Sequence, residues 1–171
     1  MNYTTDIART TKDPKILTEI FRHGRIGRNV RDNDVTQCAA RNSDCPPEIL
    51  AEILKRGKDD YVSRNAAWNK NCPPEILIEV LRRWKNDDVS QYAARNINCP
   101  SEILVEVLNK GKYNQVSCIA ANNPNCPLKE KIKWMQVTGR IGKEDPSKHI
   151  IEYENNKEDD FQDLRDLLKN C

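Results

Sequence analysis

Apolar residues recur along the middle of the chain with the spacing of amphipathic helices. Two stretches place them at positions i, i+1, i+4 and i+5: Ile49, Leu50, Ile53 and Leu54, then Ile76, Leu77, Val80 and Leu81. The pair Ile103-Leu104 begins a third stretch, and each follows its predecessor by 27 residues. A Cys-Pro step precedes each stretch, and a glutamate lies three residues past the cysteine, which is the capping-box position. The pattern predicts one helix after each Cys-Pro.

A second, shorter element is expected before each Cys-Pro. It opens with a valine in register, followed by paired alanines and then an asparagine. Small side chains at a fixed position allow close approach of neighbouring backbones, which favours a short buried helical turn. Asparagine tolerates a left-handed backbone or bonds its own loop, so it is a plausible stop. The asparagines are Asn42, Asn69, Asn96 and Asn123.

The combined pattern, Val-x-x-x-Ala-Ala-x-Asn-x-x-Cys-Pro-x-Glu-Ile-Leu, resembles the leucine-rich repeat variant family. The resemblance covers residues 35 to about 135. It implies an all-α fold: a right-handed α-solenoid of 27-residue repeats in which a short 3₁₀-like helix alternates with an α-helix, with terminal capping helices. Cysteine stands where the family usually has threonine before the proline, and we expect it to take over the capping role. The first cysteine is Cys38, so the cysteine-rich N-terminal iron–sulfur module of the best-known member has no counterpart.

The sequence predicts a single structural domain in three parts. Residues 1–34 are expected to hold a loose lead-in, a capping half-repeat with only the long helix, and a basic insertion loop over 23–31. Residues 35–142 would form four repeats, of which the last is degenerate because Lys129 replaces the capping glutamate. Residues 143–171 would form an acidic capping segment ending in a helix that covers the last repeat.

Charge and hydropathy exclude several classes of protein. The net charge is only +2, although the segment 144–171 carries nine acidic and four basic side chains. That balance is too weak to mark a nucleic-acid binder outright. No apolar run reaches the roughly 18 residues of a membrane span, and no signal-peptide pattern opens the chain. We therefore expect a cytoplasmic protein with no membrane contact.

Seven cysteines invite a metal hypothesis, but their spacing argues against it. Cys45, Cys72, Cys99 and Cys126 fall at equivalent places in successive repeats. Stacked helices lie about 8–10 Å apart, too far for zinc ligands or a disulfide. The chain also lacks a phosphate-binding motif and a nucleophile with a neighbouring histidine. We expect no metal, no cofactor and no enzymatic activity.

Candidate binding residues are those that vary inside the constant frame. Positions four apart in the short element share a face of their helix. The pairs are Gln37 with Arg41, Arg64 with Trp68, Gln91 with Arg95, and Cys118 with Asn122. Stacking would line these pairs into a ribbon, with Trp68 flanked by Arg41 and Arg95 of the neighbouring repeats. A bland alternative is that Trp68 shields its own repeat and the arginines only solubilise the protein. Trp84 replaces the glycine that closes sister helices. The candidate partner-binding residues are Arg41, Arg64, Trp68, Arg95, Trp84, Arg25, Arg28 and Arg31.

We expect a non-enzymatic protein-binding scaffold or inhibitor that presents an extended surface, because stacked repeats offer long surfaces and no chemistry is visible. Another protein is the expected partner, and a monomer is the favoured state. The alternative is a nucleic-acid-binding solenoid similar to HEAT-repeat proteins, which would use an arginine-rich face.

Overall fold

The computed structural model describes residues 3–23, 30–111 and 113–142, and side chains in residues 30–33 are outside this description. All regular structure in these ranges is α-helical, so the all-α prediction is confirmed there. Within them, no helix has both the length and the hydropathy needed to cross a membrane. The helices are α1 (Thr5–Thr10), α2 (Pro14–His23), α3 (Val30–Arg41), α4 (Pro47–Lys55), α5 (Tyr61–Trp68), α6 (Pro74–Leu81), α7 (Asp88–Arg95), α8 (Ser101–Lys110), α9 (Gln115–Asn122) and α10 (Leu128–Val137).

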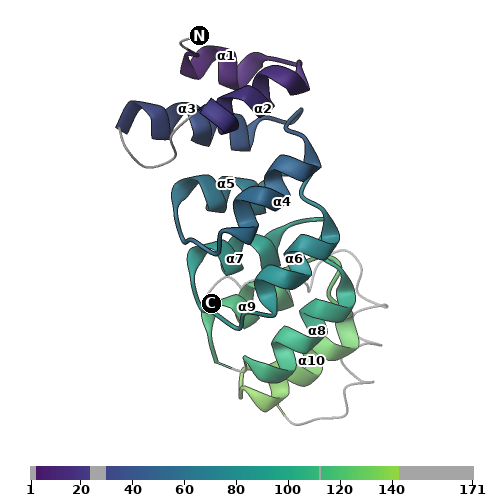
Figure 1. Ribbon diagram of the computed structural model, residues 1–171. Coiled ribbons are helices and arrows are strands. Elements are labelled where there is room, and N and C mark those ends of the chain that lie inside the picture. Colours follow the sequence, from purple (N-terminus) through teal and green to yellow (C-terminus); the bar gives the residue numbers. More distant parts are fainter. Residues whose placement is uncertain (1–2, 24–29, 112, 143–171) are drawn as a thin grey trace.

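The helices form two rows that run the length of the molecule (Figure 1). The first row contains the odd-numbered helices, and each packs against the next: α1 on α3, α3 on α5, α5 on α7, and α7 on α9. In the second row, α4 packs on α6, α6 on α8, and α8 on α10. Helices α2, α4, α6 and α8 also contact the first-row helix that follows each of them. These contacts all join neighbours along the stack.

The second-row helices bury the apolar stripe that the sequence predicts. Ile76, Leu77, Val80 and Leu81 of α6 are all buried, as are the equivalent residues of α4 and α8. The predicted capping role of the cysteine is wrong. The residue that caps α6 is Pro73, in an extended conformation and without a side-chain cap bond, so Pro74 is the first helical residue. The cysteine lies outside the helix and is buried with its thiol in the core. The glutamate still lies in the first turn, where the helix dipole favours a negative charge.

The first-row helices begin at caps that the sequence analysis missed. Asp60, Asp87 and Asn114 accept a hydrogen bond from the backbone N–H of the serine three residues later, at 2.8–2.9 Å. Burial raises the pKa of Asp60, but the hydrogen bonds from Ser63 and the charge of Arg56 outweigh it and hold that pKa below its usual value. These caps satisfy one orphan N–H of each helix. They explain why an eight-residue α-helix forms where the sequence predicts only a short turn.

A ladder of buried asparagines joins each unit to the one before it. The side-chain amide of Asn69 donates to the carbonyls of Ala40 and Asn42, both at 2.8 Å. Asn96 and Asn123 repeat these bonds one step further along, at 2.7–2.9 Å. Each asparagine ends its helix with an extended backbone, not the left-handed one. Of the two roles that the sequence left open, bonding is the one used.

The N-terminal unit is more complete than the sequence predicts. Residues 1–12 were expected to be a loose lead-in, but α1 occupies the first row and buries Ala8. The amide of Asn42 donates to the carbonyls of Ala8 and Thr11, both at 2.9 Å, so the ladder reaches this unit as well. Helix α3 begins at Val30, inside the expected insertion loop. Residues 24–29 and the expected C-terminal cap at 143–171 lie outside the described residues.

Candidate functional site

A hollow of about 340 Å³ lies where three successive first-row helices end. Arg41, Trp68 and Arg95 are the last residues of α3, α5 and α7, and all three line it. The 27-residue spacing of these side chains predicts that they are neighbours, and the structure brings them together. Lys70 and Ile97, from the loops that follow α5 and α7, complete the lining on the solvent side.

The asparagine ladder fixes the position of this hollow. The buried asparagine that follows each helix is held by bonds to the preceding unit, so the residue just before it is carried to the surface at the same place in every unit. Trp68 is therefore 46% exposed although its neighbours Ala67 and Asn69 are buried. More than half of the side chain is covered, so the alternative that Trp68 shields its own unit stays beside the binding interpretation.

The hollow is electropositive and its cations are unpaired. The side chains of Arg41, Lys70 and Arg95 have no hydrogen bond or ion pair with any other described residue, and no acidic residue lines the hollow. Exposed cations gain little from isolated surface pairs, but a row of them without acidic neighbours attracts anionic groups.

Trp68 is held in place by an aromatic neighbour. Its ring and that of Tyr92 on α7 lie 6.0 Å apart with an interplanar angle of 74°. This edge-to-face arrangement is a favourable one for aromatic pairs. An indole restrained in this way loses little conformational freedom on binding, which suits an anchor residue.

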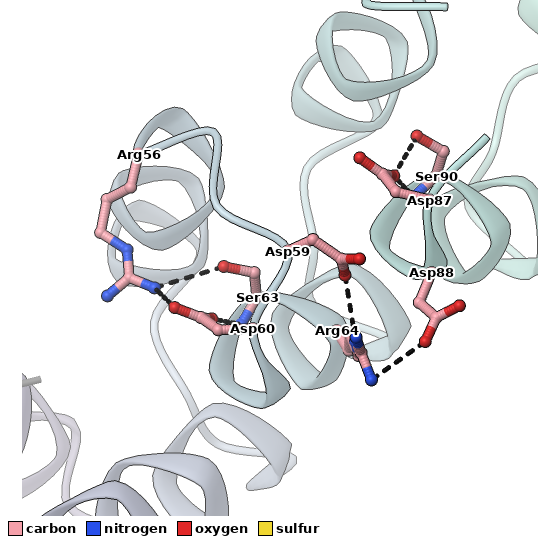
Figure 2. A network of polar contacts seen from close by, with 8 residues as sticks. All are labelled: Arg56, Asp59, Asp60, Ser63, Arg64, Asp87, Asp88 and Ser90. Atoms are coloured by element: carbon pink, nitrogen blue, oxygen red, sulfur yellow. Dashed lines mark hydrogen bonds and ion pairs between the residues drawn. The ribbon is translucent and has the colours of Figure 1, made fainter. Parts of the chain in front are cut away.

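Arg64 does not belong to the hollow, contrary to the expected arrangement around Trp68. Its guanidinium binds the carboxylates of Asp59 at 3.0 Å and Asp88 at 2.9 Å, as Figure 2 shows, and lies 5.0 Å from the centre of the Tyr61 ring. Spacing of four residues puts Arg64 on the same helix face as Trp68. Acidic residues at the start of this helix and the next one capture it.

The other predicted residues do not join the hollow. Cys118 is buried, so the expected alignment of exposed pairs ends at α7. Trp84 lies at the far end of α6, where Lys110 sits 3.9 Å from the centre of its ring. Its φ of 55° matches the 66° of Gly57, so it occupies a backbone position that suits glycine. Arg25 and Arg28, and the side chain of Arg31, lie outside the described residues.

The four cysteines of the Cys-Pro steps are expected to be unreactive. Burial raises the pKa of Cys45, Cys72 and Cys99 to about 12, and that of Cys126 to about 11. Their thiols stay protonated at neutral pH and are poor nucleophiles and metal ligands. In the part of the chain that the structure describes, no group of histidine, cysteine and carboxylate side chains is arranged to hold a metal ion.

Ser43, Lys70 and Ile97 are lining residues that were not predicted from the sequence. Each directly follows a ladder asparagine. Comparing that position between units would have found them, because it varies while its neighbour is constant.

No protein-family model, curated protein or solved structure was found to match the chain.

Proposed function

We propose that the chain is a non-enzymatic protein-binding scaffold that captures its partner at the hollow around Trp68. The observation that carries the proposal is an exposed, restrained tryptophan among three cations that pair with no other described residue, built by three successive units. Tryptophan and arginine are the residue types most often found as interface hot spots. An inhibitor that covers a binding surface of its partner would use the same contact.

The proposal includes an architecture. The two rows and the 27-residue step of the asparagine bonds support a right-handed α-solenoid similar to the leucine-rich repeat variant family. Nearest-neighbour contacts are the hallmark of such stacks. The proposal also includes a cytoplasmic location and a monomeric state. The four buried thiols of the Cys-Pro steps fit a reducing compartment, whereas the disulfide of Cys118 is of a kind that oxidising compartments favour.

The experiment compares two matched double variants. The chain is immobilised, its partner is captured from the native cell and purified, and binding is then measured by calorimetry. We expect Trp68→Ala with Arg95→Ala to weaken binding by at least ~2 kcal/mol, the usual hot-spot threshold. The melting temperature should barely move, because both residues are exposed.

The control pair is Arg82→Ala with Trp84→Ala. It removes the same two residue types just after the C-terminal end of α6, away from the hollow. Binding should be unchanged in that variant. Loss of binding in the control pair alone would move the site to Trp84. Unchanged binding in the first pair would reduce the hollow to a solvated surface.

The alternative, nucleic-acid binding, is supported by the same cations. It predicts a steep fall of affinity with salt, because phosphate contacts release counterions. A protein contact anchored by Trp68 should depend on salt less steeply, because the apolar contact with the indole involves no ions.

A further inference from the structure

The hollow around Trp68 continues toward the N-terminus. A second hollow, of about 630 Å³, is lined by Arg9, Cys38, Arg41, Asn42 and Ser43. Arg41 and Ser43 line both hollows, so the two meet at the end of α3. Together they follow the ends of four first-row helices, from α1 to α7. We call this combined surface the track.

The track carries one unpaired cation for each step along the row. Arg9 is in the last turn of α1, Arg41 and Arg95 end α3 and α7, and Lys70 follows α5. All four residues are exposed, and none of their side chains pairs with another described residue. Among the other described arginines, Arg56, Arg64 and Arg82 bind carboxylates. Arg83 donates to the carbonyl of Leu54 and Arg140 lies over the Trp134 ring, whereas Arg22 and lysines such as Lys55 also pair with no other described residue. The track is therefore distinguished by cations at successive steps with no acidic residue among the described residues that line it.

We propose, resting on the function proposed above, that the track binds an acidic peptide segment in an extended conformation. Packed helices lie about 8–10 Å apart, and an extended chain rises about 3.3 Å per residue. One step along the row therefore equals roughly three peptide residues. The segment carries an acidic residue at about every third position, and its apolar anchor lies against Trp68 and Ile97.

The chemistry of the track fits carboxylates. Guanidinium groups bind carboxylates through paired, charge-assisted hydrogen bonds, and Arg9, Arg41 and Arg95 supply three such groups. Ile97 is 59% exposed and adds apolar area beside Trp68. An aliphatic or aromatic side chain of the peptide would bury both surfaces.

Single-stranded nucleic acid fits the track less well. Such strands stack successive bases on successive aromatic side chains, whereas Trp68 is the one aromatic residue lining the described hollows.

Fluorescence anisotropy with designed probes tests the proposal on the full-length chain. The main probe is a labelled peptide with glutamate at every third position and a central leucine. A second probe replaces each glutamate with glutamine, a third groups the same glutamates together, and the fourth is an oligothymidylate of equal length. We expect the periodic glutamate peptide to bind at least ~10-fold more tightly than each of the other three.

Equal binding of the glutamate and glutamine peptides would overturn the proposal. Tighter binding of the oligothymidylate would overturn it in favour of nucleic acid. If the peptide with grouped glutamates binds as tightly as the periodic one, affinity does not depend on the spacing of the acidic residues, and the extended arrangement is wrong.

Charge-reversed variants locate the contact. Arg9 lines the second hollow, away from Trp68. We expect Arg9→Glu to lower the affinity for the glutamate peptide at least ~5-fold, and Arg9→Gln to have an intermediate effect. Lys55→Glu, an exposed reversal on α4, should leave binding unchanged. Circular dichroism and thermal melting verify that each variant is folded. If the captured partner needs Trp68 and Arg95 while Arg9→Glu has no effect, the proposed function stands and the peptide track fails. If Trp68 and Arg95 can be removed without loss of the partner, the proposed function fails.

Discussion

At the scale of single residues, the ladder asparagines combine three functions in one side chain. The amide of Asn96 donates to two carbonyls of the preceding unit, and its side-chain oxygen accepts from the backbone N–H of Asn98 at 2.8 Å. These groups are buried, where an unpaired polar atom costs more than a hydrogen bond gains. Each asparagine therefore ends its helix, shapes the next loop and aligns two units.

We expect Asn96→Ala to lower the free energy of unfolding by roughly 3 kcal/mol, because it leaves two carbonyls and one N–H buried without these partners. Urea unfolding measures the loss. Asn109→Ala, an exposed residue of α8, is the control and should stay within about 0.5 kcal/mol of the parent protein. A loss at Asn96 no larger than the control would show that the ladder does not hold the units together.

The buried thiols predict how stability depends on alkaline pH. The pKa of Cys72 is raised by burial from 9.0 to about 12, so the folded state resists ionisation that the unfolded chain permits. Stability from this group is complete below pH 9.0 and is lost as the pH rises toward about 12. One thiol contributes about 1.4 kcal/mol per pH unit in that window.

Cys72→Ala should therefore show a shallower decline of unfolding free energy with pH, by about 1.4 kcal/mol per unit, despite a lower starting stability. Urea unfolding between pH 9.0 and about 11 gives both slopes. Parallel slopes for the variant and the parent would mean that the Cys72 thiol ionises freely in the folded protein.

Sequence reasoning at this scale found the neighbours in the hollow but not all of their partners. Arg41, Trp68 and Arg95 were predictable because they share one position of the 27-residue step. The capture of Arg64 depends on Asp88, which lies on a different helix. Helical spacing alone does not show such a contact.

At the scale of elements, one connection is closed by an unusual residue. Trp84 adopts a φ of 55°, a conformation that costs an L-residue roughly 1–2 kcal/mol and that glycine adopts freely. Gly57 holds the matching place after α4 with a φ of 66°. The stacking of Lys110 on the indole offsets part of that cost.

We expect Trp84→Gly to be more stable than Trp84→Ala by about 1 kcal/mol, the reverse of the usual order of these two residues. Both variants lose the indole, so their difference isolates the backbone. The matching change Gly57→Ala should cost about 1 kcal/mol because of the positive φ alone. Steric crowding adds nothing, since the nearest atom to the added methyl group is 3.9 Å away. Thermal unfolding of the three variants tests this. An alanine as stable as glycine at both positions would mean that neither connection needs the left-handed backbone.

The second-row helices were predictable because their apolar stripes are long and regular. Helix α1 was not, because Ala8 is its one buried residue and the valine, paired alanines and asparagine of the frame are missing. Its position depends on contacts with α3 and on Asn42, which are distant in sequence. Propensity within six residues cannot reveal a helix that neighbours stabilise.

At the scale of the whole molecule, stability is distributed along the stack. Helix α5 contacts helices on both sides of its row, whereas α1 contacts α3 alone within the row. In such an array each unit is stabilised by its nearest neighbours, so the ends open first.

Hydrogen exchange should therefore be slowest in α5, α6 and α7 and faster in α1 and α2. Native-state exchange followed by mass spectrometry resolves these segments. A cooperative unit that opens all at once would give α1 and α5 equal protection, and that result would contradict additive stacking.

The asparagine ladder also has an evolutionary consequence. The joints made by Asn69, Asn96 and Asn123 each use a donor from the later unit and acceptors from the earlier one, 27 and 29 residues apart. A tandem duplication of residues 70–96 would reproduce both bonds at the new joint and leave every older joint unchanged. Copy number can therefore change in one genetic event without a period of broken contacts. We expect natural homologues to differ in length by whole multiples of this repeat length. Each added unit would supply one more surface position that can contact a partner.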